Sequence, residues 1–132
     1  MALTLSVLPQ SLAVCRLSPQ AKIPAWVWRQ PFFCAARTDD EISLLLNEDV
    51  LKKKSALVAD WSIEDGWRAF KVLGPLDFSL TGILSAIAAP LAEAGISIFA
   101  LSTYDTDYVL VRAHALDSAC AVLSAAGYQI KR

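Results

Sequence analysis

The stretch Leu73-Gly-Pro-Leu-Asp-Phe-Ser-Leu-Thr-Gly-Ile-Leu84, running on to Asp107, decides the fold of this chain. It predicts a strand end, a tight turn, a helix, a second strand and an acidic hairpin. The helix start and the polar tip at residues 102–107 should then lie on neighbouring elements. Because helix N-termini bind carboxylates and acidic side chains bind ammonium groups, this arrangement predicts a site for a small zwitterion.

The second half of the chain predicts the order strand, helix, strand, strand, helix, strand, which is the ferredoxin-like split unit. The predicted strands are residues 67–73, 96–103, 108–112 and 128–131, and the predicted helices are residues 80–94 and 116–126. The strand at residues 96–103 is apolar on both faces, so we expect it in the centre of the sheet.

The helix at residues 80–94 has its own start and stop signals. Its apolar face consists of Leu80, Ile83, Leu84, Ile87 and Leu91. Ser79 is placed to cap the helix, and Gly95 suits the left-handed position after its end. Pro90 removes one backbone hydrogen bond, but Leu91 keeps the period, which predicts a kink and not an end.

The first half predicts a degenerate version of the same unit, without a strong first helix. The predicted strands are residues 3–7 and 11–17, joined by a tight turn, followed by residues 25–29, 32–37 and 55–60. The Glu64-Asp65-Gly66 turn favours a boundary near the middle of the chain. We therefore expect two units, residues 1–63 and 64–132.

One helix of the first half is predicted from its start signal. Thr38 and Glu41 have the spacing of a capping box, and acidic residues between them suit the positive end of a helix dipole. The apolar stripe that follows comprises Ile42, Leu45, Leu46 and Val50. This pattern predicts an amphipathic helix lying on a sheet.

Composition argues against several classes of function. The 132 residues contain 12 Lys and Arg against 13 Asp and Glu, and a nucleic-acid backbone needs clustered cations. The apolar run at residues 82–101 includes Pro90 and Glu93, so we expect no membrane segment. The hydrophobic content of 55 % is high and predicts an apolar face buried against a partner.

The three cysteines and the single histidine also limit the chemistry. The cysteine count is odd and no pair has C-x-x-C spacing, which predicts reduced thiols in a cytoplasmic protein. His114 alone is too little for a zinc site. No nucleophile–base pair is evident, so we expect no metal, no cofactor and no enzyme.

Three stretches resemble the ACT domain family, in particular small bacterial proteins with paired ACT modules. They are residues 74–84, Pro90-Leu-Ala-Glu-Ala-Gly-Ile-Ser-Ile98 and Ser102-Thr-Tyr-Asp-Thr-Asp-Tyr-Val-Leu110. The pattern is also similar to the regulatory ACT modules of aspartate kinases and to the CASTOR arginine sensors. The resemblance implies an α+β fold of two ferredoxin-like ACT units, the first degenerate, with antiparallel sheets and helices on one face.

The resemblance also implies an allosteric regulatory protein that binds an amino acid at a module or subunit interface and forms a homodimer. The predicted ligand-binding residues are Asp77, Phe78, Ser79, Leu80, Thr81, Gly82, Ser102, Thr103, Tyr104, Asp105 and Asp107. The helix start would hold the carboxylate. Asp105 and Asp107 would hold the ammonium group or a basic side chain, with Asp77 as an alternative. The regulatory enzymes of this family have an attached catalytic domain, which we do not expect here, so the resemblance names no regulated partner.

Each candidate residue also has a purely structural interpretation. Gly82 permits close helix–sheet packing, Ser79 caps, and Asp105 and Asp107 are ordinary turn formers. A ligand-free interaction module on an ACT scaffold is therefore the alternative function. An enzyme on a ferredoxin-like scaffold is a third, disfavoured by the lack of an acid–base or metal cluster.

Overall fold

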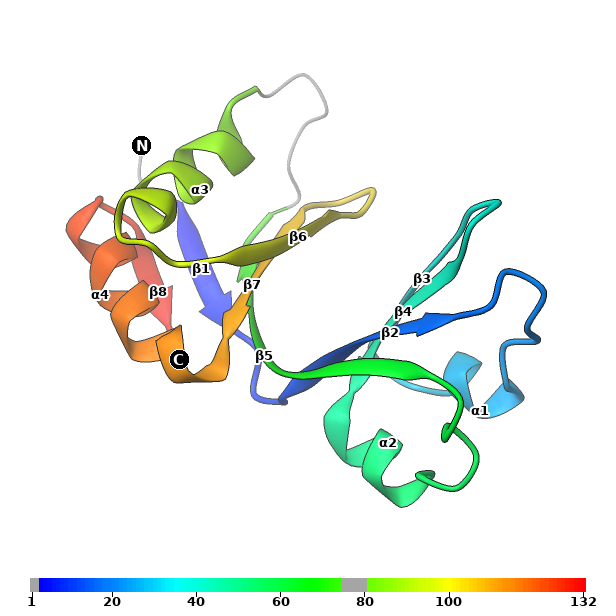
Figure 1. Ribbon diagram of the computed structural model, residues 1–132. Coiled ribbons are helices and arrows are strands. Elements are labelled where there is room, and N and C mark those ends of the chain that lie inside the picture. The colour runs from blue at the N-terminus through cyan, green and yellow to red at the C-terminus, as the bar shows by residue number, and fades with distance from the viewer. Residues whose placement is uncertain (1–2, 75–80) are drawn as a thin grey trace. The chain divides into compact units, whose positions relative to one another are not determined.

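The computed structural model describes residues 3–74 and 81–132 (Figure 1). Its contacts group the chain into two compact units, which we call the inner unit, Gln10–Trp67, and the split unit, Met1–Pro9 with Arg68–Arg132. The long strand β5, Ser62–Val72, contributes its first part to the inner unit and its last part to the split unit. The boundary expected between two ACT units, at residues 63 and 64, remains a prediction.

The inner unit has the order strand, helix, strand, strand, helix, strand. Its elements are β2 Leu12–Leu17, α1 Ala25–Trp28, β3 Cys34–Arg37, β4 Ile42–Asn47, α2 Glu48–Lys53 and the first part of β5. The strand order is β3-β4-β2-β5, with antiparallel pairing throughout. The first helix is a single four-residue turn, as expected for a degenerate first unit.

The split unit repeats this order and adds one strand. Its elements are β1 Thr4–Val7, the last part of β5, α3 Ile83–Glu93, β6 Ile98–Ser102, β7 Asp107–Arg112, η1 Ala113–Ala115, α4 Leu116–Ala125 and β8 Gln129–Lys131. The strand order is β6-β7-β5-β1-β8. Strand β1 therefore lies between β5 and β8, antiparallel to the first and parallel to the second.

The core of the split unit lies between one face of the sheet and both helices. Leu5 and Val7 of β1 are paired with Val72 and Phe70 of β5, so these side chains share a face. They form one buried cluster with Ile87 and Leu91 of α3 and Leu116, Ala119 and Leu123 of α4. Helices α3 and α4 thus cover the same face, visible in Figure 1, as predicted.

Helix α3 ends where the sequence predicts. The Gly95 N–H bonds to the Ala92 carbonyl at 3.0 Å and the Ile96 N–H to the Leu91 carbonyl at 2.9 Å. This is a Schellman motif, and Gly95 supplies the required positive φ of 73°. The helix continues through Pro90, so the proline does not end it. The predicted start at Leu80 and the Ser79 cap fall outside the described residues.

The predicted helix after Thr38 is wrong, because the chain there forms β4. The Thr38 hydroxyl does accept the N–H groups of Asp40 and Glu41, at 3.1 and 3.2 Å, but these bonds close a hairpin turn. Ile42, Leu44 and Leu46 alternate into the inner core, which is strand periodicity. Pairing with β2 on one side and β3 on the other decides the outcome over local propensity.

Four further predictions about strands are wrong. Residues 25–28 form α1 after Pro24, and residues 54–60 form turns. Strands β1 and β2 are strands as predicted, but in the described structure they pair with other strands and not with each other. Strand β6 pairs only with β7 among the described residues, so it is an edge strand and not a central one.

Gly66 lies inside β5, and the predicted Glu-Asp-Gly turn is therefore also wrong. The register between β2 and β5 shifts between Leu12 and Val14, opposite this glycine. Gly66 has φ of 75°, and its N–H donates to the Glu48 carboxylate at 2.9 Å. A left-handed glycine forms a β-bulge as readily as a turn, and only strand pairing separates the two.

Each of the three cysteines is a free thiol, in agreement with the sequence. Cys15 is 1 % exposed in the inner core, and burial raises its thiol pKa from 9.0 to about 12. The folded state therefore keeps the proton that the unfolded state releases above pH of about 9. The stability that this preference supplies is complete below that pH and declines as the pH rises toward 12.

We therefore expect a pH-dependent difference between the wild type and Cys15→Ala. The wild type should lose up to about 1.4 kcal/mol of unfolding free energy per pH unit above pH 9 relative to the variant. Urea unfolding of both proteins between pH 8 and 10.5 measures this difference, and subtraction removes the titration of tyrosines and lysines. A difference that stays constant across this range would contradict the buried, neutral thiol.

Candidate functional site

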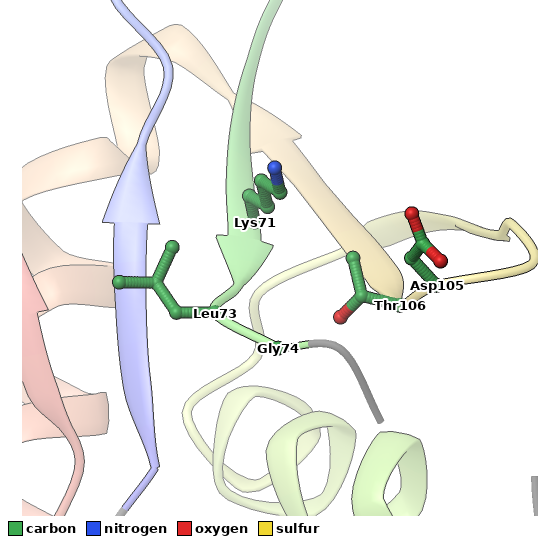
Figure 2. A pocket seen from close by; sticks show the side chains of 5 residues that line it. All are labelled: Lys71, Leu73, Gly74, Asp105 and Thr106. Atoms are coloured by element: carbon green, nitrogen blue, oxygen red, sulfur yellow. The ribbon is translucent and has the colours of Figure 1, made fainter. Parts of the chain in front are cut away.

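A pocket of about 220 Å³ lies in the split unit, between the end of β5 and the tip of the β6–β7 hairpin. Figure 2 shows its lining side chains, Lys71, Leu73, Gly74, Asp105 and Thr106. Pockets for drug-sized ligands start at about 300 Å³. This smaller pocket therefore suits a compact ligand with few heavy atoms.

Thr106 ties the two walls of the pocket together. Its hydroxyl donates to the Val72 carbonyl of β5 at 2.6 Å, and the residue is 4 % exposed. Within the hairpin, the Thr103 N–H donates to the Thr106 carbonyl at 2.8 Å, and the Thr106 N–H donates to the Thr103 hydroxyl at 3.3 Å. The tip is thus fixed both internally and against the strand end.

The described lining of the pocket has one charge of each sign. Lys71 comes from β5 and is half-buried, whereas Asp105 comes from the hairpin tip and is exposed. In Figure 2 Lys71 arises from β5 and Asp105 from the hairpin tip, with Thr106 between them. A ligand with a carboxylate and an ammonium group can meet both charges through charge-assisted hydrogen bonds.

The other predicted hairpin residues lie around this pocket and not in its lining. The Ser102 hydroxyl donates to the Asp107 carboxylate at 2.5 Å, across the base of the hairpin. Thr103 is engaged with Thr106, and Tyr104 is 81 % exposed at the tip. The structure therefore separates the two predicted acids, with Asp105 in the pocket and Asp107 bonded to its neighbour.

The predicted carboxylate end is described only in part. Asp77, Phe78, Ser79 and Leu80 lie outside the described residues. Thr81 and Gly82 are exposed, and Gly82 is the N-cap of α3. The first N–H groups of α3 have no acceptor within the helix itself. These two residues do not line the pocket, so their contact with a ligand stays a prediction.

Four of the lining residues were not among the predicted site residues: Lys71, Leu73, Gly74 and Thr106. Lys71 alternates with Phe70 and Val72, which are buried, so its side chain leaves the opposite face of the strand. That alternation is visible in the sequence, but only pairing of β5 with the hairpin region places the lysine near Asp105. The sequence does not single out Thr106, because a threonine in a hairpin is usually exposed to solvent.

Other chemistries find little support among the described residues. His114 is exposed in η1. No group of three or more His, Cys, Asp or Glu side chains in the described part of the chain could hold a metal ion. None of the described helices is long and apolar enough to cross a membrane.

Comparison with known sequences finds an ACT-domain family model and proteins named as arginine sensors. A family model described as the ACT domain matches residues 62–125, and another, described as an N-terminal domain, matches residues 10–54. The human protein named cytosolic arginine sensor for mTORC1 subunit 1 is 35 % identical over 94 residues, as is the Bos taurus protein. These matches cover 70 % of this chain, which spans only 29 % of those relatives.

Comparison with solved structures finds the same fold along nearly the whole chain. A protein from Agrobacterium tumefaciens has a TM-score of 0.85 at 35 % identity, with 98 % of this chain and 92 % of that chain covered. The regulatory subunit of aspartate kinase from Thermus thermophilus has a TM-score of 0.68 at 12 % identity, covering 96 % and 99 %, which shows a shared fold. The chain belongs to the ACT domain family.

Proposed function

We propose that this protein is a regulatory ACT protein of the cytoplasm that binds a free amino acid and has no catalytic activity of its own. Relatives that match it are named as an arginine sensor and as a regulatory subunit. The observation that carries the proposal is the small pocket with Lys71 on one wall and Asp105 on the other. We propose neither a membrane nor a nucleic acid as a binding partner.

In this proposal the two charges of the amino acid are bound at opposite ends of the pocket. Asp105 accepts the α-ammonium group, and Lys71 donates to the α-carboxylate. Because Lys71 is half-buried, its interaction with a carboxylate is less screened by solvent than one at an open surface. Leu73 and Gly74 leave the ligand side chain a lining without charge.

The remaining predicted residues surround this arrangement. The first N–H groups of α3 and the Thr81 hydroxyl would supply further donors to the carboxylate of a ligand that extends beyond the pocket lining. The contacts predicted for Asp77, Phe78, Ser79 and Leu80 fall outside the described residues and stay predictions. Ser102 and Thr103 hold the hairpin through their bonds to Asp107 and Thr106. With Tyr104 and Asp107, they would contact a ligand side chain that extends out of the pocket. If that side chain is basic, Asp107 is its partner, since the bond from Ser102 occupies only one of its oxygens.

Signalling requires that binding be coupled to another interaction. We propose a homodimer in which a second copy of the chain closes the pocket, so that the ligand favours one arrangement of the copies. Any effect of the ligand on partner affinity must then equal the effect of the partner on ligand affinity. Sedimentation with and without the ligand tests this part.

A thermal-shift screen against the twenty amino acids tests the proposed function. A ligand at one hundred times its Kd adds about 2.7 kcal/mol of stability, which for a chain of this size raises the Tm by roughly 10 °C. If no amino acid shifts the Tm at millimolar concentration, the sensor function is excluded and a ligand-free interaction module is favoured.

Two pairs of variants locate the site. Asp105→Asn and Lys71→Met should each reduce the affinity for the shifting amino acid by about tenfold or more, because each removes a charge-assisted hydrogen bond. Glu93→Gln and Lys131→Met are matched controls, since both residues are exposed in the same unit and do not line the pocket. Isothermal titration calorimetry measures all four variants.

If the pocket variants and their controls bind the amino acid with equal affinity, this pocket is not the binding site.

Asp107 is tested in the same way with Asp107→Ala, which should lower the affinity for an amino acid with a basic side chain more than for one without. An equal loss for both ligands would assign Asp107 to the hairpin alone.

A further inference from the structure

A second pocket, of about 350 Å³, lies in the inner unit between α2, the turns that follow it and β5. Its volume falls in the range of known small-molecule sites. Its described lining shares no residue with that of the pocket between β5 and the hairpin. Six of the residues that line it are apolar: Ala13, Leu51, Val58, Ala59, Trp61 and Ile63. The pocket is therefore a separate candidate site with a mainly apolar wall.

The apolar wall is continuous with the core of the inner unit and is fixed by packing. Ala13, Leu51 and Val58 are at most 5 % exposed and belong to the buried cluster of that unit. The Trp61 ring packs against this cluster and is stacked on Trp26, with centroids 5.9 Å apart and an interplanar angle of 17°. These contacts hold the indole in one orientation, so it presents a fixed aromatic surface to a ligand.

The β5 side of the pocket leaves apolar surface in contact with water. The Ile63 side chain is 39 % exposed, although the residue is paired with the buried Cys15 of β2. Covering an aliphatic side chain is favourable in proportion to the area that is removed from water. A ligand with an apolar body therefore gains by covering Ile63 while it lies against Trp61.

The charged residues of the lining already have partners within the protein. The Glu48 carboxylate accepts the Gly66 N–H at 2.9 Å and pairs with Lys52 at 3.2 Å. Asp65, which also lines the pocket, has an interaction partner as well. An ionic ligand would lose part of its hydration and would find no unpaired counter-ion in the described lining to replace it. The compensated charges therefore favour a neutral ligand.

We propose that this pocket binds a small, neutral aromatic molecule with one polar group, of the phenol, indole or arylalkanol type. Its ring lies against Trp61, because two aromatic rings attract each other beyond the effect of the buried area, and it covers Ile63. Ser55, an exposed residue of the lining, supplies a hydroxyl that donates to or accepts from the polar group. The proposal concerns the inner unit and does not depend on amino-acid binding in the split unit.

Three probes of nearly equal shape test the chemical class of the ligand. 2-Phenylethanol is neutral, and phenethylamine and phenylacetate are its cationic and anionic counterparts. Each is titrated into the full chain by NMR with the Trp61 indole N–H as reporter, which is identified by its loss in Trp61→Phe. We expect saturable binding of 2-phenylethanol, with a Kd of about 1 mM or below, at least about fivefold tighter than that of either ion.

The same titration gives the results that would overturn the proposal. They are an ion that binds as tightly as 2-phenylethanol, or no saturation by 2-phenylethanol at about 10 mM, tenfold above the expected Kd. In the saturated complex, nuclear Overhauser effects between the ring protons of the ligand and the Trp61 indole should place the two rings together. Their absence would contradict the stacked arrangement.

Two matched pairs of variants test the position. Ile63→Ala removes apolar surface that the ligand covers and should weaken 2-phenylethanol binding about fivefold. Leu57→Ala is its control, since Leu57 is 64 % exposed and outside the described lining. Ala59→Trp fills the pocket from an exposed position and should abolish binding, whereas Ala56→Trp, exposed but outside the lining, should not. The Ile63 pair decides the question even if Ala59→Trp fails to fold.

The variants also separate this pocket from the amino-acid site. Asp105→Asn should leave the affinity for 2-phenylethanol unchanged, and Ile63→Ala should leave the affinity for the amino acid unchanged. If Ile63→Ala has no effect on 2-phenylethanol, or if Asp105→Asn weakens it as much as Ile63→Ala does, the inner pocket is not the binding site and the proposal fails.

Discussion

Replacing Phe70 with alanine is expected to lower the free energy of unfolding by about 3–5 kcal/mol, the usual cost for a buried phenylalanine. Phe70 is 1 % exposed and lies in β5 opposite Val7, in the cluster that joins the sheet of the split unit to α3 and α4. The loss combines the transfer of the ring from water with the cavity left between rigid elements.

Urea unfolding followed by circular dichroism measures this effect, and Phe70→Leu is its control. Leucine keeps most of the buried volume, so its cost should be smaller than that of alanine. A loss below about 1 kcal/mol for Phe70→Ala would mean that the ring is not enclosed as described.

Replacing Thr106 with valine is expected to cost about 1–3 kcal/mol, because it leaves the buried Val72 carbonyl without the hydroxyl that donates to it at 2.6 Å. The substitution nearly preserves the shape of the side chain. It also breaks the link between the hairpin tip and the end of β5, which form the two walls of the amino-acid pocket. We therefore expect weaker amino-acid binding in addition to the lower stability.

Thr106→Ser separates the hydroxyl from the rest of the side chain. Serine retains the donor and should keep most of both the stability and the affinity, measured by urea unfolding and calorimetry. If valine and serine have equal effects, the hydrogen bond to Val72 is not what positions the hairpin.

The second half of the fold is predictable because its signals are local. The apolar residues of α3 recur at helical spacing and Gly95 closes the helix. Strand β7 follows the acidic hairpin as expected. The ACT resemblance rests on the same stretches, and the family model matches residues 62–125.

The first half is harder to predict because the same local chemistry serves two structures. Thr38 makes capping-type hydrogen bonds whether a helix or a hairpin follows, and Gly66 fits a turn or a bulge. Strand β4 is decided by its pairing with β2 and β3. The pairing with β2 joins residues far apart in sequence, such as Leu12 and Asn47, which no local window contains.

The candidate site, like the fold, could be predicted from the sequence only in part. The hairpin acids are visible in the sequence, and Asp105 does line a pocket. The oppositely charged residue of the pocket, Lys71, belongs to β5. The sequence of this strand shows only an alternation of apolar and polar residues. The opposite charge is found only when β5 and the hairpin are brought together by the fold.

The central claim is that one pocket of this protein recognises both charges of a free amino acid. The most direct measurement is calorimetric titration of the amino acid that gives the largest thermal shift, together with its decarboxylated amine and its N-acetyl derivative. We predict saturable binding of the amino acid and a loss of about tenfold or more for each derivative, since each removes one charge-assisted interaction. Binding of either derivative as tightly as the amino acid itself would contradict recognition of both charges.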